Sequence, residues 1–487
     1  MLESTKPILT SAVAAISGHG RQVSKGPAKG LIPDVNALHP QRVDGVYEVT
    51  LQMSKDARRS SPRNFLVATA NAKNADGSKK YPLDIRTHSF ATKVLFDENG
   101  HIHKPKAIGV EFLEGASLYK ADPRFDSRRI GVKKRVMASR EVIVAGGAFN
   151  TPQLLKLSGI GPKSELEKFH IPIVVDLPGV GTNLQDNYEF SVVSQSPENF
   201  SVFKNSGFGI AGDQSLTQWN KGFGPYKGDG VAAGVLKHST VSGGDEDLFL
   251  FGGPISFTGF FPGYSRSSIS SFNEFTWDIL KVHPQNTAGT VTLRSKDPHE
   301  TPEINFNFFK ENADHDLTAM TEGVKLARKI LDGVPKPIGP FTEQDPGAAI
   351  DTITEIKTTI KNQAFSHHAT STCAIGGDDD AMACLDSRFR VRGVDGLRVV
   401  DASVFPRVPG SFPTLPLYMV SEKATDCILA DIKLDDAILD GFLDNEVLIE
   451  DAAEDRIVLQ QEKQSNGKKR ENNAIENGSG RKKNRSL

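Results

Sequence analysis

Alternating apolar and polar residues in the first quarter of the chain predict short β-strands. Strand-like runs span Val46–Leu51, Ala91–Phe96 and Ala107–Phe112. The last two are separated by Asp97–Gly100, a segment whose Asp, Asn and Gly residues favour a tight turn. We therefore expect these two strands to pair as an antiparallel hairpin.

A strand, a glycine turn and a helix follow one another further along the chain. Arg140–Ala145 is mostly apolar, as in strands that a sheet buries on both faces. Two glycines ending at Gly147 close this run, and a helix is predicted next. Asn150 or Thr151 is its expected N-cap and Pro152 its expected first residue. This order of elements is typical of doubly wound α/β sheets.

The middle of the chain, about residues 190–300, is rich in Gly, Ser and Phe. Leu248–Phe251 and Thr290–Leu293 are its clearest strand candidates, and their length and spacing favour an antiparallel sheet. A helix is predicted over Asp314–Leu331, because apolar residues recur there at helical spacing. Those on one face are Leu317, Met320, Val324, Ala327 and Leu331.

The pattern of a short strand and a helix returns near the end of the chain. Leu397–Val400 is a buried-strand candidate that ends at Asp401, and Tyr418–Asp431 is a helix candidate. The fold class predicted from all these elements is α/β. We expect an incomplete doubly wound, Rossmann-like domain with an inserted α+β domain built on an antiparallel sheet.

The predicted domain division has four parts. Residues 1–190 and 365–431 form the Rossmann-like domain, and 191–364 form the inserted domain. Residues 432–487 are first acidic and then rich in Lys, Asn, Gln and Gly, with few apolar residues, which is typical of a disordered tail.

Composition excludes some classes of function. The chain has 487 residues, of which 38% are hydrophobic and 24% charged, a balance typical of globular proteins. A net charge of −2 gives no overall field that favours nucleic acid or membranes, and no apolar run is long enough to span a bilayer. Three cysteines without a C-x-x-C pair argue against a disulfide framework and a zinc cluster.

The N-terminal segment is read as an amphipathic helix. Pro7–Ile16 is apolar but is interrupted by Pro, Thr and Ser, and Glu3 stands where a secretion signal prefers positive charge. No clear signal peptide is found, which favours a cytoplasmic location for the sequence as it stands.

Several longer motifs carry more specific information. Residues 147–161 read GAFNTPQLLKLSGIG, 177–186 read LPGVGTNLQD and 367–373 read HHATSTC. They are followed by LDSRFRVRGV, GLRVVDAS and PTLP, the last at 413–416. In sequence and order these motifs resemble those of the glucose–methanol–choline (GMC) oxidoreductase family, and in detail fungal members that act in secondary metabolism.

The resemblance implies a cofactor and a reaction. Members of the family use FAD to take a hydride from a carbinol carbon while a base removes the hydroxyl proton. His368, five residues before Cys373, matches the family's catalytic histidine, and histidine suits proton transfer near neutral pH. The implied partner is a small-molecule alcohol. Relatives in this family are often secreted, whereas no clear signal peptide is found here, so the location is left open.

The resemblance also implies a set of cofactor neighbours. A glycine turn that opens a helix can hold an anionic group with free N–H groups, although packing alone also explains such a turn. Asp401 on its own would equally be read as a cap. Relatives often carry His where this chain has Asn187. The implied cofactor-binding residues are Gly147, Asn183, Asp186, Asp401, Ala402, Pro413 and Thr414.

Two departures from the family pattern matter for activity. Phe412, expected in the substrate pocket, stands where many members carry a second His or Asn, and phenylalanine neither accepts a proton nor hydrogen-bonds an alkoxide. A strand with a G-x-G-x-x-G turn is not found near the N-terminus, and the match at Gly207–Gly212 follows polar residues instead of a strand. Unpaired strand edges are expected as a result.

Three functions follow from these observations. The first is an FAD-dependent oxidoreductase acting on CH–OH groups, for which the resemblance implies a role in fungal secondary metabolism. The second is a truncated, non-catalytic pseudo-enzyme, since the main pyrophosphate-binding loop is not found. The third is a flavin-binding cyclase without net redox chemistry, which Phe412 leaves open.

Overall fold

The computed structural model describes residues 2–17, 31–32, 35, 44–97, 104–204, 206–228 and 230–439. The chain forms two compact units, Met1–Ser421 and Glu422–Leu487. Residues 98–100 of the predicted turn and 440–487 of the predicted tail lie outside the described residues. The four-part domain division stays a prediction.

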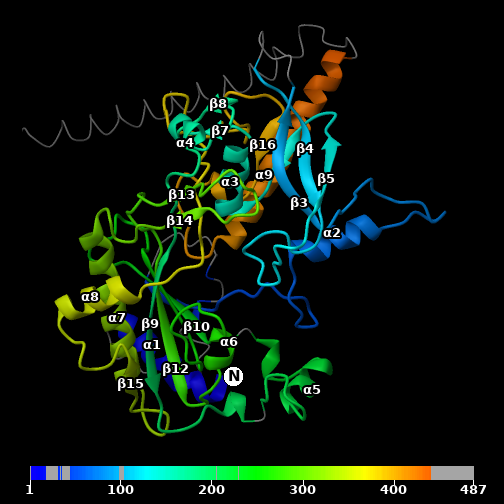
Figure 1. Ribbon diagram of the computed structural model, residues 1–487. Coiled ribbons are helices and arrows are strands. Elements are labelled where there is room, and N and C mark those ends of the chain that lie inside the picture. The colour runs from blue at the N-terminus through cyan, green and yellow to red at the C-terminus, as the bar shows by residue number, and fades with distance from the viewer. Residues whose placement is uncertain are drawn as a thin grey trace, which may run out of the picture. The chain divides into compact units, whose positions relative to one another are not determined.

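A seven-stranded sheet dominates the first unit (Figure 1). All its neighbouring strands pair antiparallel except β1 and β2. The antiparallel sheet predicted for the middle of the chain is therefore present, and a short N-terminal strand, β2, joins it. In sheet order the strands are β1 (Leu31–Ile32), β2 (Gly45–Tyr47), β10 (Ala233–Lys237), β11 (Leu248–Gly253), β12 (Glu274–Lys281), β9 (Tyr188–Gln195) and β15 (Thr342–Asp345).

Helices α1 (Leu2–Ser17), α7 (Ala313–Asp332) and α8 (Ile353–Gln363) lie together beside this sheet (Figure 1). The predicted apolar face of α7 is confirmed, because all five of its predicted positions are buried. A Cβ built on Gly323 of α7 would lie 2.4 Å from Cγ2 of Ile279 in β12, so the helix packs closely on the strand. Trp277, in the same strand, is fully buried in this core.

The opposite face of the sheet carries a different set of side chains. Alternation along a strand sends successive side chains to opposite faces. Tyr188 and Phe190 of β9 therefore point into the core shared with α7, and Glu189 points away from it. Asp278 of β12 and Phe251 of β11 are paired in register and lie on the same face as Glu189. Two buried carboxylates and several phenylalanines thus share one face.

The elements before and after the large sheet form smaller sheets. β3 (Ser89–Phe96), β4 (Ala107–Glu114) and β5 (Val132–Met137) make an antiparallel meander, which confirms the predicted pairing of the first two. β6 (Val142–Val144) pairs in parallel with β16 (Leu397–Val399). Mixed parallel and antiparallel sheets with helices confirm the predicted α/β class.

The predicted strand, glycine turn and helix are also present, with a different helix start. α3 spans Gly147–Leu157, and Gly146 is its N-cap. The predictions that Asn150 or Thr151 caps the helix and that Pro152 opens it are wrong. The Thr151 hydroxyl instead accepts from the Gly146 backbone N–H at 2.9 Å, and Pro152 lies inside the first turns.

The unpaired strand edges expected from the sequence stay a prediction, and β6, which also lies near β4, is the strand to which they apply most directly. Within the described residues, the sheet partner of β6 is β16. Ile143 is 45% exposed although it lies between the buried Val142 and Val144.

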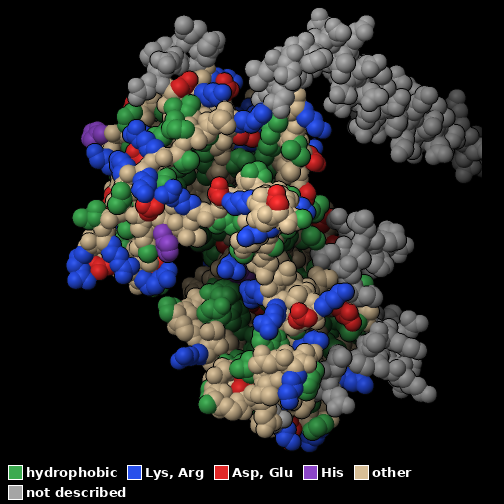
Figure 2. Space-filling model, turned by 90° about the vertical axis from the view of Figure 1, so that its right-hand side faces the viewer, with side chains coloured by type: hydrophobic (Ala, Val, Ile, Leu, Met, Phe, Trp, Pro, Cys, Tyr) green, Lys and Arg blue, Asp and Glu red, His purple; other side chains and the backbone are tan. Residues whose placement is uncertain are grey.

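Apolar, basic and acidic side chains are interspersed on the face of the molecule shown in Figure 2.

The remaining elements connect these layers. They are α2 (Pro62–Asn71), β7 (Ile160–Gly161), α4 (Lys163–Lys168), β8 (Val175–Asp176), α5 (Gln214–Asn220), α6 (Tyr264–Ser267), β13 (Thr290–Thr292), β14 (Glu303–Asn305) and α9 (Thr414–Leu439). Short 3₁₀ turns occur at Ser201–Phe203, Pro225–Lys227 and Ala402–Val404.

Candidate active site

His368 lies on an extended segment that follows α8 and runs beside the start of β9. Backbone hydrogen bonds fix this segment on both sides of the histidine. Phe365 and Glu189 exchange two of them, and Thr370 and Gln185 exchange two more, at 2.9–3.2 Å. The carboxylate of Asp186 accepts a further one from the His368 backbone N–H at 2.6 Å. Asp186, predicted as a cofactor neighbour, thus holds the backbone of the predicted base.

The His368 ring is oriented by Asn187, which is fully buried. The Asn187 amide nitrogen lies 3.0 and 2.9 Å from the carbonyl oxygens of Lys281 and Val282, and 3.3 Å from that of Gly410. Of the two ends of the Asn187 side-chain amide, only the NH₂ group can donate to these carbonyl oxygens. The other end, Oδ1, therefore faces His368 Nδ1, at 3.1 Å.

This contact selects one tautomer of His368. Because Asn187 Oδ1 only accepts hydrogen bonds, His368 Nδ1 carries the proton, and Nε2 keeps its lone pair. The side chain is 7% exposed, and burial lowers the pKa of His368 to about 3. The imidazole is therefore neutral at physiological pH, which is the form that can accept a proton.

Phe412 connects His368 with the large sheet. Its ring centroid lies 5.6 Å from that of His368, and 5.2 and 5.3 Å from those of Phe249 and Phe251 in β11. All three contacts are edge-to-face, an arrangement that aromatic rings prefer. The histidine thus borders an apolar surface, and Phe412 supplies no proton acceptor beside it.

Pro413 and Thr414 follow Phe412 at the start of α9. Phe412 and Thr414 line a cavity of about 530 Å³ together with Phe249, Leu415 and Tyr418. Thr414 and Tyr418 also line an adjoining cavity of about 570 Å³ next to Gln52 and Ser61. Pro413 is part of the chain between these walls and accepts the first helical hydrogen bond, from the Leu417 N–H. Phe412 and Thr414 therefore border space of the size that cofactor sites have, and Pro413 lies between them in the chain.

Asp401 and Gly147, two other predicted cofactor neighbours, are in direct contact. Asp401 Oδ2 accepts from the Gly147 backbone N–H at 3.0 Å and from the Thr151 hydroxyl at 2.6 Å, while Oδ1 accepts from the Ser403 N–H at 2.7 Å. Asp401 thus joins the end of β16 to the start of α3. The Ala402 carbonyl accepts from the Ser371 N–H at 3.1 Å, which ties the same turn to the His368 segment.

We expect Asp401→Ala to lower the free energy of unfolding by about 3 kcal/mol, since a buried carboxylate that accepts three hydrogen bonds is lost at a helix start. Urea unfolding followed by tryptophan fluorescence measures this change. Asp395→Ala, at an exposed aspartate, is the matched control and should change stability by less than about 0.5 kcal/mol. Equal losses in both variants would contradict the role assigned to Asp401.

Both ends of the Asn183 side chain are hydrogen-bonded within the protein. Its amide nitrogen donates to the carbonyl oxygens of Ser371 and Pro406 at 3.3 and 3.2 Å, and its Oδ1 accepts from Gln185 Nε2 at 2.6 Å. Its φ of 58° is in the left-handed region that asparagine tolerates. The predicted role of Asn183 in binding a cofactor is not tested by these contacts and stays a prediction.

Three buried carboxylates surround the two histidines. Burial raises the pKa of Asp186 to about 6, and burial followed by the charge of Asp186 raises the pKa of Glu189 to about 8. Burial and the nearby Glu189 raise the pKa of Asp278 well above its usual value. Burial lowers the pKa of His367, which is the more exposed histidine. The pocket behind His368 is thus acidic and largely dehydrated.

Sequence reasoning missed the roles of Asn187, Glu189 and Asp278. A signal existed for the two carboxylates, because each is a charged residue between two apolar neighbours in a strand, and such residues are rarely buried without a function or a partner. Asn187 carried a weaker signal, since it directly follows the predicted cofactor loop and replaces a residue type common in relatives.

Comparison with known proteins identifies the family of this chain. Two models of one family, described as GMC oxidoreductase, match residues 34–189 and 284–421, which together are more than half of the chain. The chain therefore belongs to the GMC oxidoreductase family.

Curated relatives include oxygen-dependent choline dehydrogenases. That of Burkholderia mallei is 30% identical over 384 residues, which are 76% of this chain and 60% of the relative. That of Pseudomonas putida is 31% identical over 409 residues, which are 81% of this chain and 64% of the relative. The chain thus spans about 60% of the length of the curated relatives it matches.

Solved structures share the fold. A formate oxidase from Aspergillus oryzae, described for its FAD modification, superposes with a TM-score of 0.71 at 24% identity and covers 89% of this chain and 71% of its own. A fungal aryl-alcohol oxidase superposes with a TM-score of 0.63 at 21% identity, with coverage of 88% and 71%. None of the helices in the described ranges is long and apolar enough to cross a membrane.

Proposed function

We propose that this chain is an FAD-dependent oxidoreductase that acts on the CH–OH group of a small-molecule alcohol. The observation that carries the proposal is the state of His368. Its ring is neutral, its Nδ1 proton is fixed by Asn187, and its Nε2 lone pair is left to accept a proton. Family membership supports the same reading.

The residues present fit a flavin at one end of the site. Phe412, Thr414 and Tyr418 border open, mostly apolar space of about 530 Å³, as a flat aromatic ring requires. Gly147 has a φ of 79°, and a Cβ built on it would meet no atom within 4 Å, so its backbone faces open space. We assign the ring end to Pro413 and Thr414, and place the Gly147 turn at the start of α3 beside an uncharged part of the cofactor, because the Gly147 N–H already donates to Asp401.

The chemical roles of the cofactor and of the neighbouring residues follow from this placement. FAD, when bound, supplies the acceptor for the hydride that leaves the carbinol carbon. His368 Nε2 takes the hydroxyl proton, and Asn187 keeps the ring in the tautomer that can do so. Phe412 and the phenylalanines of β11 exclude water from the reacting group. A role in fungal secondary metabolism is part of the proposal, supported by the sequence motifs.

The test is the visible spectrum of the purified full chain, before and after incubation with FAD. We expect flavin absorbance that remains after gel filtration and that is bleached under anaerobic conditions by an alcohol. Choline and benzyl alcohol are suitable probes, because relatives named for choline and aryl-alcohol substrates share the family or the fold.

Each other outcome points to a different function. A colourless chain that does not retain FAD would contradict the proposal and favour a non-catalytic protein. Retained flavin that no alcohol bleaches would favour a flavin-binding cyclase, a reading that Phe412 supports by leaving His368 without a second proton acceptor.

A further inference from the structure

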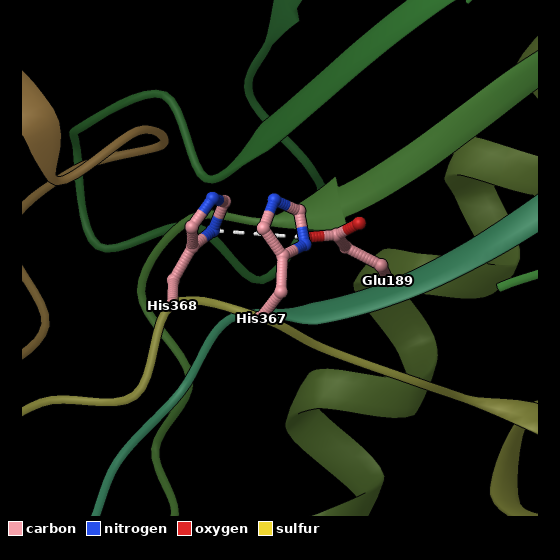
Figure 3. A group of neighbouring side chains, drawn as sticks. All are labelled: Glu189, His367 and His368. Atoms are coloured by element: carbon pink, nitrogen blue, oxygen red, sulfur yellow. Dashed lines mark ion pairs between the residues drawn. The ribbon is translucent and has the colours of Figure 1, made fainter. Parts of the chain in front are cut away.

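Three side chains of types that can bind metal ions lie close together, and one of them is the predicted base, His368. Glu189 extends from β9 toward His367 and His368, which lie side by side on the segment after α8 (Figure 3). Glu189 Oε1 lies 3.0 Å from His367 Nδ1 and 3.6 Å from His368 Nδ1. One ligand atom of each residue lies within 4.8 Å of those of the other two, and the two ring centroids are 3.9 Å apart.

These separations match a coordination shell. In a tetrahedral site with bonds of about 2.0–2.1 Å, neighbouring ligand atoms are roughly 3.3 Å apart. The two measured distances from Glu189 lie on either side of that value. Moreover, neither oxygen of Glu189 has a hydrogen bond of good geometry within the described residues, although an imidazole nitrogen lies 3.0 Å away. The donor atoms are therefore close together without being aimed at one another.

The surroundings lack positive charge. Glu189 is completely buried and Asp278 is 2% exposed, and within the described residues none of their four carboxyl oxygens has a hydrogen bond of good geometry. The nearest lysine on β12, Lys281, points to the other side of the strand and pairs with Asp247 at 3.0 Å. The cost of burying these two charges is removed either by protonation, the direction in which burial moves both pKa values, or by a bound cation.

We propose that Glu189, His367 and His368 form a binding site for a divalent transition-metal ion of the zinc class. Two imidazoles and one carboxylate are ligands that such ions prefer, whereas Mg²⁺ and Ca²⁺ favour all-oxygen sites. Three protein ligands leave a fourth position for water. The His367 side chain is 39% exposed, which gives an ion a route into the site.

The site would compete with the use of His368 as a base. His368 Nδ1 lies 3.1 Å from its hydrogen-bond partner Asn187 and 3.6 Å from Glu189, so it stands between the two. An ion bound at Nδ1 displaces the proton that Nδ1 donates to Asn187 and leaves the neutral ring protonated on Nε2, so Nε2 has no lone pair with which to accept a proton. Metal binding is thus inhibitory, a consequence that rests on the proposed function, whereas the site itself does not.

The test is metal binding by the full chain, with no affinity tag and after treatment with EDTA. Titration with Co²⁺ is followed by its visible absorption, and titration with Zn²⁺ by calorimetry. We expect one ion per chain and the intense absorption of tetrahedral Co²⁺. His367→Ala and Glu189→Gln should each weaken binding by at least about tenfold, because each removes one ligand. Glu189→Gln keeps the size of a buried side chain and removes an uncompensated charge, so it should fold.

His170→Asn is the matched control, because His170 is exposed, is far from this cluster in the fold, and has a φ of 54° that asparagine tolerates. It should bind Co²⁺ like the unaltered chain. Failure of the unaltered chain to bind either ion, or equal binding by the unaltered chain and both ligand variants, would overturn the proposal. Neither readout depends on flavin, so this result and the failure of the proposed function are distinguishable.

Discussion

Replacing His368 with alanine is expected to slow anaerobic reduction of the bound flavin by an alcohol by about 10²–10⁴-fold, the range that a positioned acid–base group contributes. The imidazole has a free lone pair on Nε2, and its neighbours Asn187 and Phe412 provide no replacement base. Stopped-flow absorbance at the flavin bands measures the rate.

His170→Asn serves as control for this experiment too and should reduce flavin at the unaltered rate. Flavin content and unfolding midpoint should be measured for both variants, so that a loss of cofactor or fold is separated from a loss of chemistry. A His368→Ala chain that retains flavin and is reduced at more than a tenth of the unaltered rate would contradict the role assigned to His368.

The sequence was sufficient for those parts of the fold that local patterns determine. The buried face of α7 follows from helical spacing of five apolar residues, and the pairing of β3 with β4 follows from two strands with a turn between them. The start of α3 was predicted wrongly for a physical reason. Its first N–H is held by Asp401, a residue 254 positions away, and no local pattern reports such a contact.

In the candidate site, too, some residues can be predicted from local motifs and others depend on long-range contacts. His368 and Asp186 are predicted because each lies in a motif, and the structure places the two in contact. Asp186 was predicted to bind the cofactor, and the contact that the structure shows is a hydrogen bond from the His368 backbone N–H to its carboxylate. Glu189 and Asp278 come from two strands about ninety residues apart, and they meet only because β9 and β12 pair in a particular register. Register depends on the whole sheet and is not visible in either strand alone.

Asn187→Leu is expected to have the second largest effect, on both stability and rate. Leucine has a similar size but offers no donor to the carbonyls of Lys281 and Val282, and no acceptor to His368 Nδ1. Leaving buried polar groups without partners costs about 1–3 kcal/mol each, so we expect a loss of unfolding free energy of about 3 kcal/mol. Flavin reduction should slow by about tenfold or more, because the tautomer of His368 is no longer fixed.

A second variant separates the orientation of the His368 ring by Asn187 from the contribution of Asn187 to stability. Asn187→Asp keeps the size and an acceptor for His368 Nδ1 but removes the donors to the carbonyls, so it should lose stability as the leucine variant does and retain more of the rate. ¹⁵N chemical shifts of labelled histidine report the tautomer directly, and the His368 Nδ1 resonance should be that of a protonated nitrogen in the unaltered chain but not in Asn187→Leu. Because Asn187 acts through His368, combining Asn187→Leu with His368→Ala should slow reduction no further than His368→Ala alone. Additive losses in the double variant would mean that Asn187 contributes to the site in some way other than by orienting the base.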